Sequence, residues 1–196
     1  MAQIPDDVND LAGAFQDGDP EAFAELVDLF QDRFYRIAYR VLGDSDEALD
    51  VVQDAFVKIH KKVDSWDRRS RFSSWAYRIV TNVAIDGLRR KSRERRAWEN
   101  RAAEQVEFQE DLAADSIVAE EQGDLVTRVR DAIDDLPPGQ RAIVALRHYE
   151  GFTLKEIAEV RGCALGTVKS TLHQAFRSLR RSLGSDLLQQ VGGESA

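Results

Sequence analysis

The sequence has little cysteine and no long apolar run. Cys163 is its only cysteine, so a disulfide within the chain is impossible, and a lone thiol is typical of proteins that work in a reducing cytoplasm. No apolar stretch approaches the length of a membrane span, and the N-terminal residues lack the basic and apolar segments of a signal peptide. We therefore expect a cytoplasmic protein without membrane insertion.

Motifs of enzymes and metal sites are also missing. The histidines His60, His148 and His173 do not stand at metal-ligand spacing with Cys163. No glycine-rich phosphate loop and no Ser-His-Asp pattern occurs, and the pair Asp134-Asp135 fits a solvated helix end better than a general acid and base. We expect no catalytic residue, no metal, no cofactor and no enzymatic activity.

Charged residues are abundant but unevenly distributed. The net charge of −8 alone argues against DNA binding. Residues 1–60 carry a net −10, residues 61–101 a net +8, residues 102–135 a net −9 and residues 136–196 a net +3. This alternation predicts two basic blocks that face DNA, separated by acidic segments that avoid DNA or meet basic protein surfaces.

Helical periodicity predicts an all-α fold of two small helical domains joined by an acidic linker. The first fifteen or so residues are polar and are expected to fray. We divide the chain into an N-terminal tail, a first domain, a linker, a second domain and a C-terminal tail, at residues 1–14, 15–96, 97–121, 122–186 and 187–196.

Two helices open the first domain. Asp19-Pro20 predicts the start of a helix whose apolar stripe, from Phe23 to Val41, stops at Gly43. Asp44 and Glu47 have the spacing of a capping box for the next helix. The predicted buried seam of that helix consists of Leu49, Val52, Phe56, Ile59 and Val63.

The second of these helices has a polar face. Asp50, Gln53 and Asp54 stand at i, i+3 and i+4, so they share one exposed side of the helix. This face is either a solvated acidic surface, which is the commoner case, or a docking surface for a basic partner.

The segment Asp64–Arg96 interleaves aromatic residues with cations and runs into a third helix, for which Ser73 is a plausible N-cap. Cations attract a phosphate backbone, and aromatic faces stack on bases that have left the duplex. The pattern thus indicates a surface for opened, single-stranded DNA. The competing interpretation is that the aromatic residues are core and the arginines a solvated helix end.

The second domain contains a helix-turn-helix pattern. Thr153 and Glu156 form a capping box before a short helix, Ala158 is the small residue that crossing helices need, and Gly162 suits the tight turn. Val168 then packs a long last helix back on the first. The outward residues of that helix would enter a major groove: Thr167, Lys169, Ser170, His173, Gln174 and Arg177. A generic helical hairpin is the alternative.

These segments carry a family likeness. Leu49–His60 together with Phe72–Arg90 resembles region 2 of bacterial RNA polymerase sigma factors, and Leu136–Arg181 resembles their region 4. The length, the two-domain plan and the absence of further regions resemble the extracytoplasmic-function (ECF) subfamily. The likeness covers about residues 15–185 in the right order.

The resemblance implies a function for each surface. Asp50, Gln53 and Asp54 would dock on the clamp helices of the largest subunit of core RNA polymerase, whose second-largest subunit offers its flap. The last helix would bind the −35 element as duplex, and the linker would thread toward the active site and RNA exit of the polymerase. The residues expected to hold single-stranded −10 DNA are Trp66, Arg71, Phe72, Trp75, Tyr77, Arg78, Thr81, Asn82, Arg89 and Arg90.

The resemblance also implies a probable anti-sigma factor as partner. The chain departs from its family where arginines are common, at Thr171, Gln174 and Phe176, which predicts weaker phosphate contact or altered preference at the −35 element. Arginines before Phe72 would shift affinity toward the −10 side. Two other functions compete: a stand-alone helix-turn-helix regulator of duplex DNA, and an RNA-binding or adaptor protein.

Overall fold

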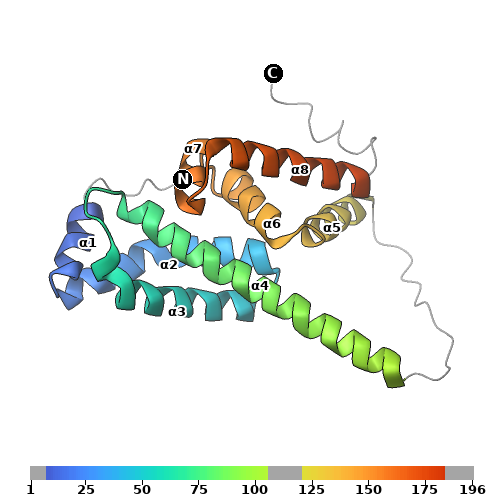
Figure 1. Ribbon diagram of the computed structural model, residues 1–196, viewed down its shortest axis with the longest axis horizontal. Coiled ribbons are helices and arrows are strands. Elements are labelled where there is room, and N and C mark those ends of the chain that lie inside the picture. The colour runs from blue at the N-terminus through green and yellow to red at the C-terminus, as the bar shows by residue number, and fades with distance from the viewer. Residues whose placement is uncertain (1–7, 106–120, 184–196) are drawn as a thin grey trace.

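The computed structural model describes residues 8–105 and 121–183, and within these ranges every regular element is a helix (Figure 1). The residues 1–7, 106–120 and 184–196, which include parts of both predicted tails and of the linker, lie outside this description. The helices are α1 (Val8–Gln16), α2 (Pro20–Leu42), α3 (Ser45–Lys62), η1 (Val63–Ser65), α4 (Phe72–Gln105), α5 (Glu121–Asp134), α6 (Pro138–Val144), η2 (Ala145–Tyr149), α7 (Leu154–Arg161) and α8 (Leu165–Leu183).

Helices α1 to α4 form the first domain around an aromatic core. The rings of Phe30 and Phe34 lie 5.8 and 5.7 Å from the ring of Tyr77, and all three side chains are buried. The predicted ends of α2 are confirmed: Asp19 accepts hydrogen bonds from the backbone of its first turn, and Gly43 ends it in the left-handed conformation at φ 75°. Asp44 likewise caps α3.

Two predictions about helices were wrong, those for the N-terminal residues and for the N-cap Ser73. Residues 8–16, expected to fray, form α1, because Val8, Ala12 and Phe15 give this short segment an apolar side that is buried on the domain. Helix α4 continues to Gln105, well into the predicted linker, and its last turns extend beyond the bundle (Figure 1). It also begins at Phe72, so Ser73 lies inside it and is not the cap.

Helices α5 to α8 form the second domain, and the helix-turn-helix prediction is confirmed in detail. Thr153 and Glu156 make both hydrogen bonds of the capping box at the start of α7. Gly162 ends α7 at φ 60°, a conformation that disfavours side chains with a Cβ. Val168 is completely buried against the helices that precede it.

The two domains pack on one another through a shared core. Residues of η2 and α7, including Leu146 and Ile157, belong to the same buried cluster as the aromatic core of the first domain. The buried Arg141 pairs with Asp134 at 2.9 Å and donates to the carbonyl of Val41 at 3.0 Å, and burial lowers the pKa of its guanidinium. None of the described helices is both long and apolar enough to cross a membrane.

Candidate functional site

The acidic face of α3 lies at the surface as predicted. Asp50, Gln53 and Asp54 are all exposed. The predicted seam was wrong about Leu49, which is 51% exposed beside them, as is Val57 at 49%. The small residues Ala48, Val51 and Ala55 face the core instead. The surface therefore combines carboxylates with two large apolar side chains, and we call these five residues the α3 patch: Leu49, Asp50, Gln53, Asp54 and Val57.

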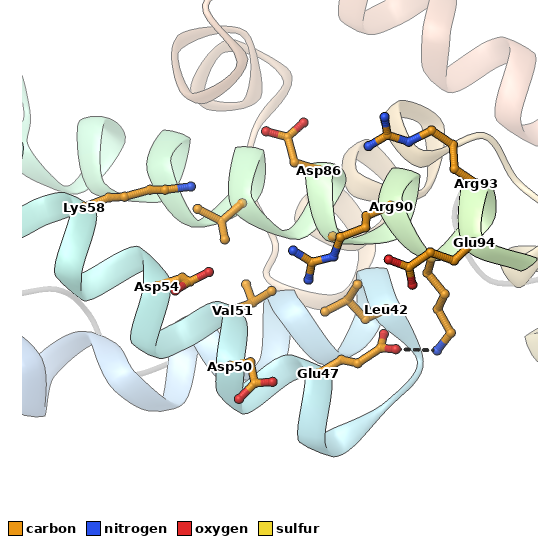
Figure 2. Close-up of a pocket in the computed structure, with 13 residues that line it drawn as sticks. Leu42, Glu47, Asp50, Val51, Asp54, Lys58, Asp86, Arg90, Arg93 and Glu94 are labelled. Atoms are coloured by element: carbon orange, nitrogen blue, oxygen red, sulfur yellow. Dashed lines mark ion pairs between the residues drawn. The ribbon is translucent and has the colours of Figure 1, made fainter.

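A groove of about 300 Å³ runs between the α3 patch and α4 (Figure 2). Asp50 and Asp54 line it from α3, and Arg90 and Asp86 from α4. One end is tied by an ion pair of 2.9 Å between the Lys91 Nζ and the Glu47 carboxylate. Cations from α4 and carboxylates from α3 therefore share the groove, so it suits a partner that carries both charges.

The predicted −10 residues divide into a buried and an exposed group. Trp66, Phe72, Tyr77 and Thr81 are between 0 and 3% exposed and belong to the core, as the competing interpretation held. The expectation that their side chains face DNA does not fit this arrangement. Their burial has a clear cause, since Phe72 packs against the rings of Trp66 and Trp75, at 5.3 and 5.5 Å. The residues that reach solvent are Arg71, Trp75, Arg78, Asn82, Arg89 and Arg90.

A polar stripe on α4 meets α7 of the second domain. Ser74, Arg78 and Asn82 stand at i, i+4 and i+8. The hydroxyl of Ser74 donates to Glu159 at 3.3 Å, and Arg161 donates to the amide oxygen of Asn82 at 3.0 Å. We call these three α4 residues the α4 stripe. In this arrangement α7 covers part of the surface expected to contact DNA.

Between these contacts the guanidinium of Arg78 lies directly against Gly162. A Cβ on Gly162 would come within 2.8 Å of it. The Gly162 position thus serves both the turn and the close approach of the α4 stripe. Only the first of these roles can be inferred from local sequence.

Next to the α4 stripe is a second cavity, of about 480 Å³, lined by residues of both domains. Arg71, Trp75 and Arg78 supply its cationic and aromatic walls, and Glu159 closes one side. Hydrogen bonds from Thr153, with a smaller contribution from the charge of Arg71, lower the pKa of the nearby Glu156. A ring flanked by two guanidinium groups is chemically suited to a base and its phosphates.

The three arginines of the loop before α4 have different surroundings. Arg68 hydrogen-bonds Gln16 and the carboxylate of Asp17, and Arg69 pairs with Asp67. The expectation that all three shift affinity toward the −10 element stays a prediction, and the contacts of Arg68 with α1 do not favour it for that residue. Arg71 is exposed and lines the second cavity.

The outward face of α8 lies at the surface as predicted. All six of its expected DNA residues are exposed: Thr167, Lys169, Ser170, His173, Gln174 and Arg177. Phe176, where the family resemblance leads us to expect an arginine, is 41% exposed and makes an edge-to-face contact with His148 at 5.4 Å. Within the described ranges, no cluster of three or more His, Cys, Asp or Glu is arranged to hold a metal.

Comparison with known proteins agrees with this layout. The sequence matches the family models Sigma-70 region 2, over residues 26–94, and Sigma-70 region 4, over residues 127–179. The ECF RNA polymerase sigma factor SigW of Bacillus subtilis (strain 168) is 34% identical over 170 residues, which cover 85% of this chain and 91% of SigW.

Two solved structures share the fold. The structure of CnrH in complex with the cytosolic domain of CnrY has a TM-score of 0.66 and 23% identity, and the match covers 92% of this chain and 99% of CnrH. The sigma factor RpoE of Bartonella quintana, in complex with the anti-sigma factor NepR, has a TM-score of 0.57 and 24% identity, and the match covers 84% and 98% of the two chains.

Proposed function

From the premise that this chain belongs to the ECF RNA polymerase sigma factors, we propose which of its surfaces perform each step of promoter recognition. As a sigma factor, it directs transcription initiation by core RNA polymerase. The stand-alone regulator considered from the sequence is set aside, because both family regions occur in order in one chain. We place its action in the cytoplasm and assign it no catalytic step.

The α3 patch is the surface that docks on the polymerase clamp. A solvated acidic face would carry charge alone, whereas here Leu49 and Val57 are half-exposed among the carboxylates. Apolar side chains surrounded by charge are typical of a protein interface. Leu49→Ser should therefore weaken assembly with core polymerase at least about fivefold, as expected for an interface anchor worth more than about 1 kcal/mol.

The matched control is Leu29→Ser, since Leu29 is 38% exposed on α2. Assembly is measured by competition for core polymerase against a labelled copy of the unaltered protein. Equal loss in both variants, or no loss in Leu49→Ser, would contradict the docking assignment.

The −10 element binds on the exposed part of the aromatic-basic segment. Arg71, Trp75 and Arg78 surround the second cavity, and Arg89 continues the cationic surface along α4, whereas Arg90 lines the groove between α3 and α4. Single-stranded DNA in this position would stack on Trp75 while the guanidinium groups contact phosphates. The same surface carries Ser74–Glu159 and Asn82–Arg161, so DNA can reach it only after α7 moves away.

This movement can be tested with a reversible cross-link. The variant Ser74→Cys/Glu159→Cys, in a Cys163→Ser background, is joined by a short bis-methanethiosulfonate linker that reductant cleaves. The linked protein should still bind core polymerase through the α3 patch but should not open promoters, and cleavage should restore initiation. Cys163→Ser alone, treated identically, is the control. Full activity of the linked protein would contradict the separation of α7 from α4.

The −35 element binds the outward face of α8 as duplex. Val168 holds this helix in place while Thr167, Lys169 and Ser170 lie exposed near its start, the geometry in which helix-turn-helix proteins read a major groove. The flap of the second-largest polymerase subunit is the proposed protein contact of the second domain. An anti-sigma factor completes the set of partners, since a protein similar in fold is described in complex with one.

The observation that carries the proposal is the pairing of a cavity whose aromatic and cationic walls come from the first domain with an exposed recognition helix in the second. It is tested by transcription in vitro with core polymerase and a genomic fragment library, followed by sequencing of the transcript starts. We expect starts that share two asymmetric elements. Initiation from no fragment, or from starts with no shared elements, would refute the function.

A further inference from the structure

Polar side chains of α1 hold both ends of the loop that precedes α4. The amide nitrogen of Gln16 donates to the carbonyls of Val63 and Trp66, at 2.9 and 3.2 Å, where the loop begins. The amide oxygen of Gln16 accepts a hydrogen bond from Arg68 in the middle of the loop. A single side chain thus fixes three points of the loop.

Asn9 holds the other end of the loop. Its amide oxygen accepts from the backbone N–H of Phe72 at 2.8 Å, and its amide nitrogen lies 3.5 Å from the carbonyl of Ser70. Phe72 is the first residue of α4, so its N–H is one of the donors that a helix leaves without an intrahelical partner. Asn9 therefore caps α4 from a different helix.

Arg68 adds a connection between the loop and the backbone of α1. Its guanidinium donates to the carbonyl of Gly13 at 3.3 Å and to the carboxylate of Asp17. A Cβ at Gly13 would lie 3.7 Å from this guanidinium, which shows how closely the arginine follows the helix. The donors of Arg68 are therefore engaged by α1 and by Asp17, which follows it.

The helix that makes these bonds is itself firmly seated. Val8, Ala12 and Phe15 are buried, and the ring of Phe15 lies 4.7 Å from Phe23 and 5.4 Å from His60. Asn9 and Gln16 are seven residues apart, two helical turns, so they project from the same side of α1. A rigid helix whose side chains Asn9 and Gln16 hydrogen-bond the two ends of the loop is suited to setting the shape of that loop.

We propose that α1 positions the −10-binding loop, with Asn9 and Gln16 as positioning residues that set where Arg71 and Trp75 lie. This inference rests on the proposed function of that loop. It concerns residues outside the matched family region, which begins at residue 26. In this proposal Arg71 and Trp75 contact the DNA, and α1 acts on them only by setting the shape of the loop.

Trypsin provides the first test, because the loop contains Arg68, Arg69 and Arg71. Asn9→Leu removes both contacts of Asn9 with the loop, whereas Asn9→Asp keeps the acceptor for the N–H of Phe72. Loss of the short hydrogen bond from the N–H of Phe72 should raise the rate of cleavage in the folded full-length protein about fivefold, whereas the 3.5 Å contact with Ser70 contributes little. Asn9→Asp, and Asp10→Ala at an exposed site on the same helix, should cleave at the unaltered rate.

Gln16→Leu is the second variant and should accelerate loop cleavage more than Asn9→Leu, since it removes three hydrogen bonds. Fragment masses identify cleavage in the loop, and cleavage after Arg89 or Arg90 is the internal reference. Loop cleavage as slow in Asn9→Leu and Gln16→Leu as in Asp10→Ala would overturn the proposal. This assay requires no polymerase, so it is independent of the proposed function.

The functional test uses core polymerase and a promoter, identified with the unaltered protein, in which each −10 base is randomised. Asn9→Leu and Gln16→Leu should change the relative use of −10 bases by about fivefold or more, while Asn9→Asp and Asp10→Ala retain the original preference. A general loss of stability would lower all transcripts equally, which would overturn a positioning role. Failure of the unaltered protein to initiate would instead refute the function itself.

Discussion

The ion pair between Arg36 and Glu150 is a sensitive test of how the two domains are joined. Its two contacts measure 3.1 and 3.3 Å, and they raise the pKa of Arg36. The Glu150 side chain is only 6% exposed, whereas the Arg36 side chain is 53% exposed. Breaking a fully buried pair costs about 3–5 kcal/mol, and breaking a surface pair about 0.2–1 kcal/mol. Because the Arg36 side chain is half-exposed, we expect Arg36→Ala to lower the free energy of unfolding by about 2 kcal/mol, between these two ranges.

A double-mutant cycle separates this pair from other effects. Glu150→Gln keeps the shape of the side chain and one acceptor, so the double variant should be less unstable than the sum of the single variants by about 1 kcal/mol. The measurement is urea unfolding of the full chain, followed by tryptophan fluorescence. A coupling energy below about 0.3 kcal/mol, within the ordinary error of additivity, would refute the reasoning that the pair links the domains.

Further predictions concern the second domain and the end of α2. Replacing Lys169 and Arg177 together with alanine should weaken promoter binding by the holoenzyme and reduce the salt slope by about two units; unchanged affinity in a salt titration would contradict the groove assignment. The hydrogen bond from Thr153 is the main cause of the lowered pKa of Glu156. The ionised Glu156 therefore stabilises the fold above its ordinary pKa of 4.5, and this stabilisation is lost as the pH falls through the pKa in the folded protein. Thr153→Val should therefore flatten the fall of urea stability below that pH. Gly43→Ala should cost about 1 kcal/mol in the same assay, because Gly43 has φ 75°.

The starts of α2, α3 and α7 could be predicted from the sequence because their causes are local. Asp19 and Asp44 bond the backbone of the next turn, and Thr153 and Glu156 bond each other across three residues. Such contacts depend on no distant segment, so spacing alone identifies them. The π-helical turn at 145–149, which continues α6, has no comparable local signal in the sequence.

Burial was harder to predict where several residues compete for one side of a helix. In α3 the larger Leu49 was expected to be buried, yet Ala48 takes the core position on the side of α3 that packs against α2 and α4. In α4 the sequence alone is equally compatible with aromatic residues in the core and with aromatic residues that stack on DNA bases. Only their packing partners, such as Phe30 for Tyr77, decide that Tyr77 is core while Trp75 reaches the second cavity.

The same limit applies to contacts between distant segments. A short segment such as residues 8–16 gives a weak helix signal by itself, because an isolated helix of nine residues is marginal and its side chains Asn9 and Gln16 bond to a distant loop. The role of Gln16 becomes clear only when Val63 and Trp66 lie beside it. The family match at 26–94 does not include it either, so the structure supplies the missing information.

The contact between α4 and α7 is strong enough to form and weak enough to be replaced. Arg78 lies at the C-terminal end of α7, where the helix dipole stabilises a cation by about 0.3–1 kcal/mol. A charge-assisted hydrogen bond to a phosphate is worth about 1.5–3 kcal/mol. Moving from Gly162 to a DNA phosphate therefore lowers the interaction free energy of Arg78. Ser74 and Asn82 each replace one charge-assisted hydrogen bond by another. If Arg78 drives the exchange, Arg78→Ala should impair promoter opening more than Asn82→Ala, and equal effects would show that the other residues of the α4 stripe contribute as much.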